Sequence, residues 1–173
     1  MVMKLLNGIM FNISWLLIVL AQDALISWAV AAVHVTLHML VMGRGRAELQ
    51  LLGLAAVVGL AVDQLLFTAN VLGNATGAAG APLWLSALWP VFATTLLHAF
   101  AGLRANLLLA AMIGGIGGYL SYRVGTGLSG VDFAQPMFTD AVLIVLWGVL
   151  FPSLLVMAAQ LSAGQEERGV RPA

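Results

Sequence analysis

Long apolar stretches separated by short polar breaks run along nearly the whole chain. A transmembrane helix needs about 20 mainly apolar residues, and six stretches of suitable length follow one another. They cover about residues 5–21, 24–42, 47–69, 82–103, 106–123 and 138–161. Glycine, asparagine and charged residues fill the breaks. The pattern predicts an all-α polytopic membrane protein, a compact bundle of six transmembrane helices.

The composition agrees with lipid as the natural solvent. Of the 173 residues, 62% are hydrophobic and 8% are charged, whereas a soluble domain is about 25% charged. The formal net charge is +0 and the basic residues form no cluster beyond Arg44 and Arg46, so we do not expect nucleic-acid binding. Because the chain has no cysteine, disulfides, iron–sulfur clusters and thiol catalysis are excluded.

The basic residues also predict an orientation. With the N-terminus in the cytoplasm, all of them except Arg123 lie on the inner side. These residues are Lys4, Arg44, Arg46, Arg104, Arg168 and Arg171. The distribution predicts cytoplasmic N- and C-termini, with a single six-helix domain over residues 1–162 and a polar, disordered tail over 163–173. The open alternative makes the first segment a signal peptide, since "VLA" at 19–21 suits a cleavage site.

Two histidines four residues apart raise the question of a site inside the membrane. Ionisable residues there are costly, and each is a functional candidate. His34 and His38 share one face of the second span, and His98 of the fourth span lies at a depth similar to that of His38. Glu48, near the inner surface, is the carboxylate closest to this depth.

Three interpretations of the histidines stay open. The favoured one is that each histidine hydrogen-bonds a neighbouring helix. The candidate partners are Thr36, Thr94, Thr95 and Asn12. The second is a catalytic or proton-transfer role. The least favoured is a metal site formed by His34, His38 and His98, or a haem held between His38 and His98.

A second polar layer is expected near the outer surface. A lone Asp63 in lipid would be strongly penalised, and pairing with Arg123 would relieve that cost. Alternatively, Asp63 acts as an acid, a base or a cation site below an outward-facing cavity, and Arg123 holds a lipid phosphate or carboxylate. Further candidates for substrate or headgroup binding share this layer, together with Asp140. They are Tyr119, Tyr122, Trp84 and Trp89, the tryptophans being expected as anchors at the interface.

Two other features bear on helix packing. Gly114 and Gly118 form a GxxxG motif in the fifth span, which is typical of close helix contact. Pro90 is expected to kink the fourth span.

An ordered series of motifs runs through the spans. They are Leu5-Leu6-Asn7 with Phe11 and Trp15, a histidine at 34 or 38, Gly59 to Asp63, Pro82 to Trp89, and Gly114 to Tyr122. In these motifs the chain resembles the bacterial multi-pass inner-membrane proteins grouped as domain of unknown function 2878, over nearly its whole length to about Gln160. One departure is Tyr119, which stands where many relatives have a proline.

The resemblance implies a multi-pass protein of the bacterial cytoplasmic (inner) membrane, and it supplies no activity. Its association with genes that modify unsaturated fatty acids favours a lipid-related function: lipid or fatty-acid modification within the membrane, or an accessory subunit to it. The catalytic candidates would be His34, His38, His98 and Asp63. The alternatives are a small carrier or channel with Asp63 as its ion or proton site, and a structural or interaction protein. No cofactor is predicted. Membrane lipids are the expected partners, with a homodimer or an association with other lipid enzymes left open.

Overall fold

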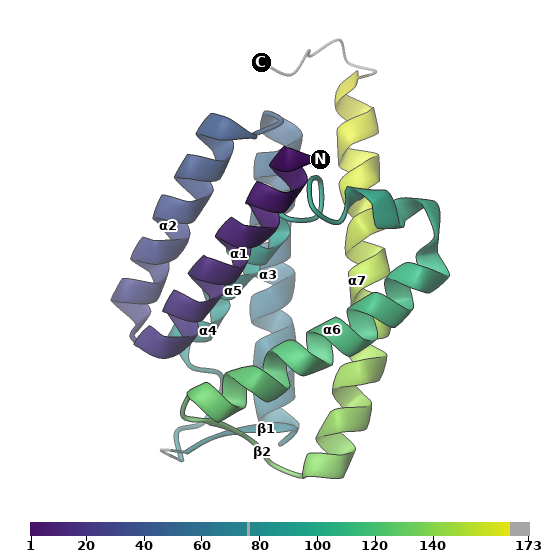
Figure 1. The fold of residues 1–173 in the computed structure, drawn as a ribbon. Coiled ribbons are helices and arrows are strands. Elements are labelled where there is room, and N and C mark those ends of the chain that lie inside the picture. Colours follow the sequence, from purple (N-terminus) through teal and green to yellow (C-terminus); the bar gives the residue numbers. More distant parts are fainter. Residues whose placement is uncertain (76, 167–173) are drawn as a thin grey trace.

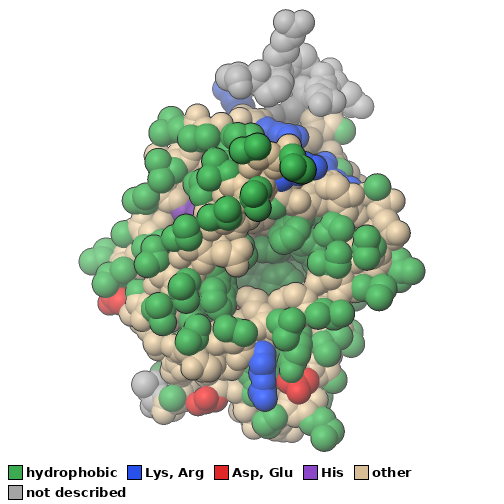
Figure 2. Space-filling view, viewed as in Figure 1, with side chains coloured by type: hydrophobic (Ala, Val, Ile, Leu, Met, Phe, Trp, Pro, Cys, Tyr) green, Lys and Arg blue, Asp and Glu red, His purple; other side chains and the backbone are tan. Residues whose placement is uncertain are grey.

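The computed structural model describes residues 1–75 and 77–166, and five long helices account for most of them. These helices are α1 (Val2–Ala21), α2 (Ala24–Val41), α3 (Arg46–Thr68), α6 (Leu107–Leu128) and α7 (Pro136–Glu166). Each is long and apolar enough to cross a membrane (Figure 1). Many of their exposed side chains are large and hydrophobic, as Figure 2 shows for one face. The predicted all-α fold is confirmed, and five of the described helices are long and apolar enough to span a membrane.

The fourth predicted span differs from the other five. In place of one continuous helix over 82–103, the chain forms α4 (Leu83–Ser86), α5 (Leu88–Ala93), a run of turns and the 3₁₀ helix η1 (Ala101–Ala105). This broken segment still carries the chain from one end of the bundle to the other (Figure 1). The prediction of six transmembrane helices is therefore wrong for this segment, although its position in the order of the bundle is correct.

Two threonine hydroxyl groups bond the backbone where the fourth segment breaks. Thr94 Oγ1 donates to the carbonyl of Val91 at 2.7 Å, and Thr95 Oγ1 donates to that of Phe92 at 2.6 Å. The backbone N–H of Thr95 also reaches back only three residues, to Phe92. Such bonds compete with the regular helical ladder. The kink expected at Pro90 is thus replaced by two interruptions, one at Ala87 and one after Ala93.

Asn7 of α1 bridges the broken segment. Its amide nitrogen donates to the carbonyl of Thr94, and its amide oxygen accepts from the backbone N–H of Ala99, both at 3.3 Å. Irregular backbone at membrane depth is tolerated where protein buries it and satisfies its polar groups. The asparagine in the first helix therefore stabilises an irregular backbone in the fourth segment.

The two ends of the bundle differ in structure. The N-terminus and the end of α7 lie at one end, together with the α2–α3 link and η1 (Figure 1). At the other end β1 (Leu72–Asn74) and β2 (Val131–Phe133) form an antiparallel pair. Lys4, Arg44 and Arg104 belong to elements at the first end, as the predicted orientation requires, but which end is cytoplasmic stays a prediction.

The predicted tail over 163–173 is only partly within the described chain. Helix α7 continues to Glu166, so the first residues of that tail are helical rather than disordered. Residues 167–173, which include Arg168 and Arg171, lie outside the described residues.

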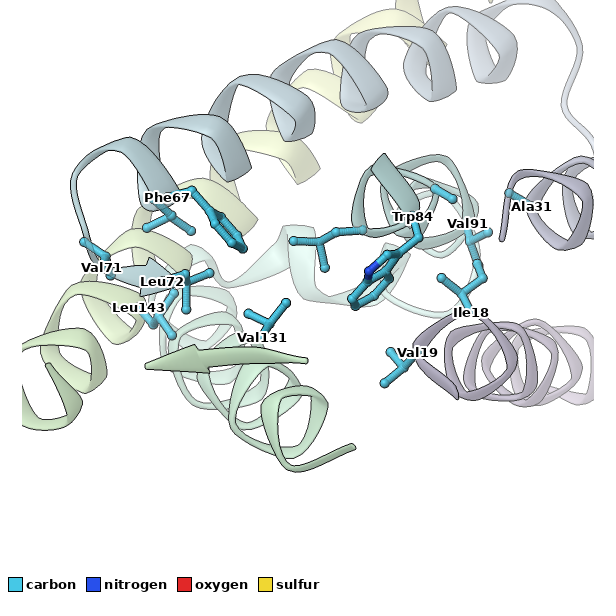
Figure 3. Close-up of a cluster of buried hydrophobic side chains, with 13 residues drawn as sticks. Ile18, Val19, Ala31, Phe67, Val71, Leu72, Trp84, Val91, Val131 and Leu143 are labelled. Carbon is cyan, nitrogen blue, oxygen red and sulfur yellow. The ribbon is translucent and has the colours of Figure 1, made fainter. Parts of the chain in front are cut away.

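Apolar side chains hold the bundle together at two levels. Near the strand pair, one cluster joins residues of α1, α3, α4, β1, β2 and α7, including Phe67, Trp84 and Leu143 (Figure 3). Along the helices, a Cβ at Gly114 would overlap Phe151 of α7, and one at Gly118 would overlap Trp147. The close contact predicted from the GxxxG motif is confirmed, with α7 aromatic rings as its partners.

Candidate functional site

Glu48 lies at the centre of a buried polar cluster at the end of the bundle that carries the N-terminus. It is in the first turn of α3 and has no exposed surface. Its Oε1 atom accepts from Nε2 of His38 at 2.7 Å and from Nε2 of His98 at 2.8 Å. Its Oε2 atom accepts from the backbone N–H of Arg44 at 2.6 Å. A buried carboxylate is costly unless such donors satisfy it.

The partners of His38 fix the position of its ring proton. Because the carbonyl of Thr94 can only accept and the N–H of Ala99 can only donate, they orient the amide of Asn7. The Asn7 amide nitrogen then donates to Nδ1 of His38, 3.3 Å away. Nδ1 is therefore an acceptor, and the proton of a neutral His38 is on Nε2, which donates to Glu48.

His34 belongs to a separate branch of hydrogen bonds. Its Nε2 lies 3.1 Å from Thr94 Oγ1, whose own proton is donated to Val91, and its Nδ1 lies 2.9 Å from Ser14 Oγ. Both ring nitrogens of His34 are thus engaged away from Glu48. The ring stacks parallel to that of His38 with centroids 6.4 Å apart.

The structure therefore brings His38 and His98 together but leaves His34 outside their contact with Glu48. The expected three-histidine grouping is wrong, because Glu48 takes the place assigned to His34. The ring centroids of His38 and His98 are 4.7 Å apart, and a carboxylate oxygen touches both nitrogens, so a porphyrin has no room between them. Of the proposed hydrogen-bonding partners, Thr94 contacts His34, while Asn12 donates to the carbonyl of Gly8 in its own helix.

Sequence reasoning named Asn7 only within a motif, placed Glu48 near the inner surface and missed Ser14, so it connected none of them with the histidines. Asn7 and Ser14 lie seven residues apart, which places them on one face of α1. That face meets the histidine face of α2 through the contacts of Asn7 with His38 and of Ser14 with His34. A search for polar residues at helical spacing in the first span would have found it.

A cavity of about 210 Å³ lies between α1, the broken fourth segment, α6 and α7. Its walls are mainly apolar and aromatic, and they include Phe11, Trp15, Trp84, Phe92 and Phe151. Figure 2 shows a hollow floored with hydrophobic side chains on the flank of the bundle, in the region between α1 and α6. The cavity therefore opens sideways, on a surface that is apolar around it.

Asp63 of α3 is the carboxylate in the wall of this cavity, and it is fully buried. Its Oδ2 atom accepts from Nε1 of Trp89 at 2.7 Å, and its Oδ1 atom accepts from the hydroxyl of Tyr122 at 2.8 Å. Trp89 stacks on Trp147 with centroids 5.5 Å apart. Gly59 lets the Trp89 indole approach, because a Cβ there would overlap the ring.

The expected pairing of Asp63 with Arg123 is wrong. The Arg123 guanidinium lies over the ring of Phe133, 5.2 Å from its centroid. Across residues 1–75 and 77–166 the ion pairs are those of Glu48 with His38 and His98. Neighbouring positions on a helix face different directions, and here Tyr122 faces inward and Arg123 is exposed.

The other members of the outer layer are arranged differently from the expectation. Trp84 and Trp89 are buried, with 7% and 4% of their surfaces exposed, so they line the cavity and do not anchor the outside of the helices. Tyr119 packs against the cluster of Figure 3. Asp140 has a buried oxygen, Oδ1, without a partner in the described chain. Of the expected outer layer, Tyr122 and Trp89 are therefore the members that bond Asp63.

Comparison with known proteins gives a family and no activity. The family model described as "Protein of unknown function (DUF2878)" matches residues 4–153, which include the Glu48 cluster and the cavity. Neither the curated proteins nor the solved structures gave a match.

Proposed function

The chain belongs to the DUF2878 family of unknown function, and we propose from the cavity that it binds the acyl chain of a membrane lipid between α1, the broken fourth segment and α6. In the bacterial inner membrane that the family resemblance implies, the protein would serve lipid or fatty-acid modification, either itself or as an accessory subunit. The proposal concerns the binding step and the residues that line the cavity.

The sideways opening of an apolar cavity is the observation that carries the proposal. Ligand pockets are concave and mostly apolar, with a few polar groups that fix orientation. This cavity is open on the flank of the bundle, where the surrounding helices present hydrophobic side chains (Figure 2). In a membrane that flank faces hydrocarbon, so an acyl chain enters from lipid without crossing water.

The bonding of Asp63 favours lipid binding over ion transport. Both carboxylate oxygens already accept a hydrogen bond, from Trp89 and from Tyr122. A cation would have to displace at least one of these donors, whereas an acyl chain fills the apolar space beside them. Asp63 and Tyr122 would then meet a polar group or double bond on the bound chain.

Tryptophan fluorescence provides a direct test of occupancy. Of the five tryptophans in the chain, Trp15, Trp84, Trp89 and Trp147 line the cavity, and Trp28 is exposed on α2. In a Trp28→Phe background the emission comes from the cavity alone. We expect a fatty acid brominated along its chain to quench this emission saturably when it is added to the protein in detergent micelles.

A matched pair of glycine substitutions on α6 makes the test specific. Gly125 lines the cavity and a Cβ there would lie 3.8 Å from Trp15 of α1, whereas a Cβ at Gly127 meets nothing within 4 Å. Gly125→Leu therefore narrows the cavity, and Gly127→Leu adds the same side chain elsewhere. Displacing about two methylenes of ligand should weaken binding roughly tenfold.

Two results would overturn the proposal that the cavity binds an acyl chain. If quenching is unsaturable in the parent protein, or if Gly125→Leu and Gly127→Leu bind the brominated fatty acid equally, the cavity does not hold the acyl chain. Helical content measured by circular dichroism verifies that both variants fold.

A further inference from the structure

The Glu48 cluster has a geometry that hydrogen bonding alone does not require. His38, Glu48 and His98 come from α2, α3 and the turns after α5, and one ligand atom from each lies within 4.8 Å of the other two. Both histidines point the same atom, Nε2, at the same carboxylate oxygen, at 2.7 and 2.8 Å. Three potential ligand atoms thus converge on one point in a buried place.

From this convergence we propose that His38, Glu48 and His98 form a binding site for a divalent transition-metal ion of the zinc class. Zinc takes histidine nitrogens and carboxylate oxygens at about 2.0–2.2 Å, and a set of two histidines and one glutamate leaves its fourth position open. The ion would take the place of the two N–H protons that now lie between the imidazoles and Glu48. Each neutral imidazole would then coordinate the ion through a deprotonated Nε2 and carry its proton on Nδ1, so binding moves these protons within the rings.

The surroundings of the site orient the carboxylate. The backbone N–H of Arg44 donates to Oε2 of Glu48, which leaves Oε1 directed at the two histidines. Groups that hold a ligand in this way commonly change metal affinity by about 10–100-fold when they are removed. Two of the three ligands, His38 and Glu48, are in the last turn of α2 and the first turn of α3, so a short link fixes their separation.

Metal binding requires the amide of Asn7 to rearrange and lose hydrogen bonds. With metal on Nε2, His38 carries its proton on Nδ1 and needs an acceptor there. Asn7 provides one if its amide turns over, and this sacrifices its 3.3 Å bonds to Thr94 and Ala99. The site is therefore a metal site whose empty form is held by hydrogen bonds, and loading requires Asn7 to rearrange.

His34 provides a matched control inside the same network. It is a buried histidine one turn from His38 on the same helix, and its nitrogens are engaged by Ser14 and Thr94. His98→Gln retains an amide donor for Glu48 but removes the imidazole ligand. His34→Gln makes the same change outside the proposed ligand set.

The experiment uses the full chain in detergent, stripped with a chelator and titrated with Zn²⁺ by calorimetry. Parallel additions of Co²⁺ report ligand geometry through visible absorption. We expect one ion per chain in the natural protein, an affinity lower by about 100-fold or more in His98→Gln, and a change below about threefold in His34→Gln. His38→Gln is the second ligand variant if His98→Gln fails to fold.

Two outcomes would overturn the metal site. The first is no saturable Zn²⁺ binding by the natural protein, which would mean that Glu48 is only a hydrogen-bond acceptor. The second is equal affinity in His98→Gln and His34→Gln, which would mean that the ion binds elsewhere. Neither outcome affects the acyl-chain test, because that test uses residues of a different cavity and no metal.

Discussion

Glu48 and Asp63 are two fully buried carboxylates on the same helix, yet their neighbours give them different chemistry. Glu48 accepts from two imidazoles and one backbone N–H. Asp63 accepts from an indole and a phenol hydroxyl beside an apolar cavity. An imidazole can exchange its N–H proton for a metal ion, whereas an indole N–H only donates. The first carboxylate is thus equipped for ion binding and the second for a polar contact in an apolar cavity.

The hydrogen-bond donors to the two carboxylates also differ in whether they can become acceptors. The backbone N–H of Arg44 and the Nε2–H of His38 are fixed as donors, the latter because Asn7 occupies Nδ1. The hydroxyl of Tyr122 can rotate and become an acceptor. An amide in place of the carboxylate is therefore tolerated at position 63 and not at position 48.

The largest expected effect comes from replacing Glu48 by its amide. In Glu48→Gln, either orientation of the amide places its NH₂ group against a fixed donor, Arg44 N–H or His38 Nε2–H. Unmade hydrogen bonds of this kind to a buried charged group should lower the free energy of unfolding by about 3 kcal/mol or more. Unfolding in mixed detergent micelles, followed by circular dichroism, measures the loss.

The matched change at the second carboxylate is Asp63→Asn. Its amide oxygen still accepts from Trp89, and its nitrogen can donate to Tyr122 once the hydroxyl rotates. We expect a loss of about 1 kcal/mol. The comparison fails if Asp63→Asn destabilises the protein as strongly as Glu48→Gln does.

A glycine controls the approach of Trp89 to Asp63, and its substitution should have the next largest effect. Gly59→Ala places a Cβ where the Trp89 indole lies, so the ring must move and its bond to Asp63 weakens. Overpacking of this kind should cost about 1–3 kcal/mol. Gly53→Ala on the same helix meets nothing within 4 Å and should stabilise the helix by about 0.5–1 kcal/mol. In the same unfolding assay we expect Gly59→Ala to lower the free energy of unfolding and Gly53→Ala to raise it. Equal changes in the two variants would show that α3 does not constrain Trp89.

The helices of this fold were predictable because length and apolarity alone define a membrane span. That reasoning found α1, α2, α3, α6 and α7 within a few residues of their observed bounds. It failed over 82–103, where the composition is just as apolar. The break there coincides with the hydroxyl bonds of Thr94 and Thr95, and Asn7 contacts the irregular backbone from another helix. A hydropathy pattern does not contain such tertiary contacts.

The sequence predicted how deep the candidate residues lie along their helices but not the direction in which their side chains point. Counting residues along the helices placed His38 and His98 at one level, and they meet in the structure. Depth does not fix rotation about a helix axis, and neighbouring residues differ by about 100°. For that reason Tyr122, and not Arg123, reaches Asp63. Glu48 was placed near the inner surface by the same count, and so it was not grouped with the histidines that it contacts.

The smallest expected effect is that of Arg123→Gln, which tests whether Arg123 pairs with Asp63. If the guanidinium only covers the ring of Phe133, Arg123→Gln should lower the free energy of unfolding by at most about 1 kcal/mol. An ion pair with the buried Asp63 would instead make the loss about 3–5 kcal/mol. Tyr122→Phe provides the reference, because it removes a donor from Asp63 and should cost about 1–3 kcal/mol. If Asp63 is bonded by Tyr122 and Trp89, Tyr122→Phe must destabilise the protein more than Arg123→Gln does. In a double-mutant cycle of Arg123→Gln with Phe133→Leu, the coupling energy should account for most of the small loss caused by Arg123→Gln.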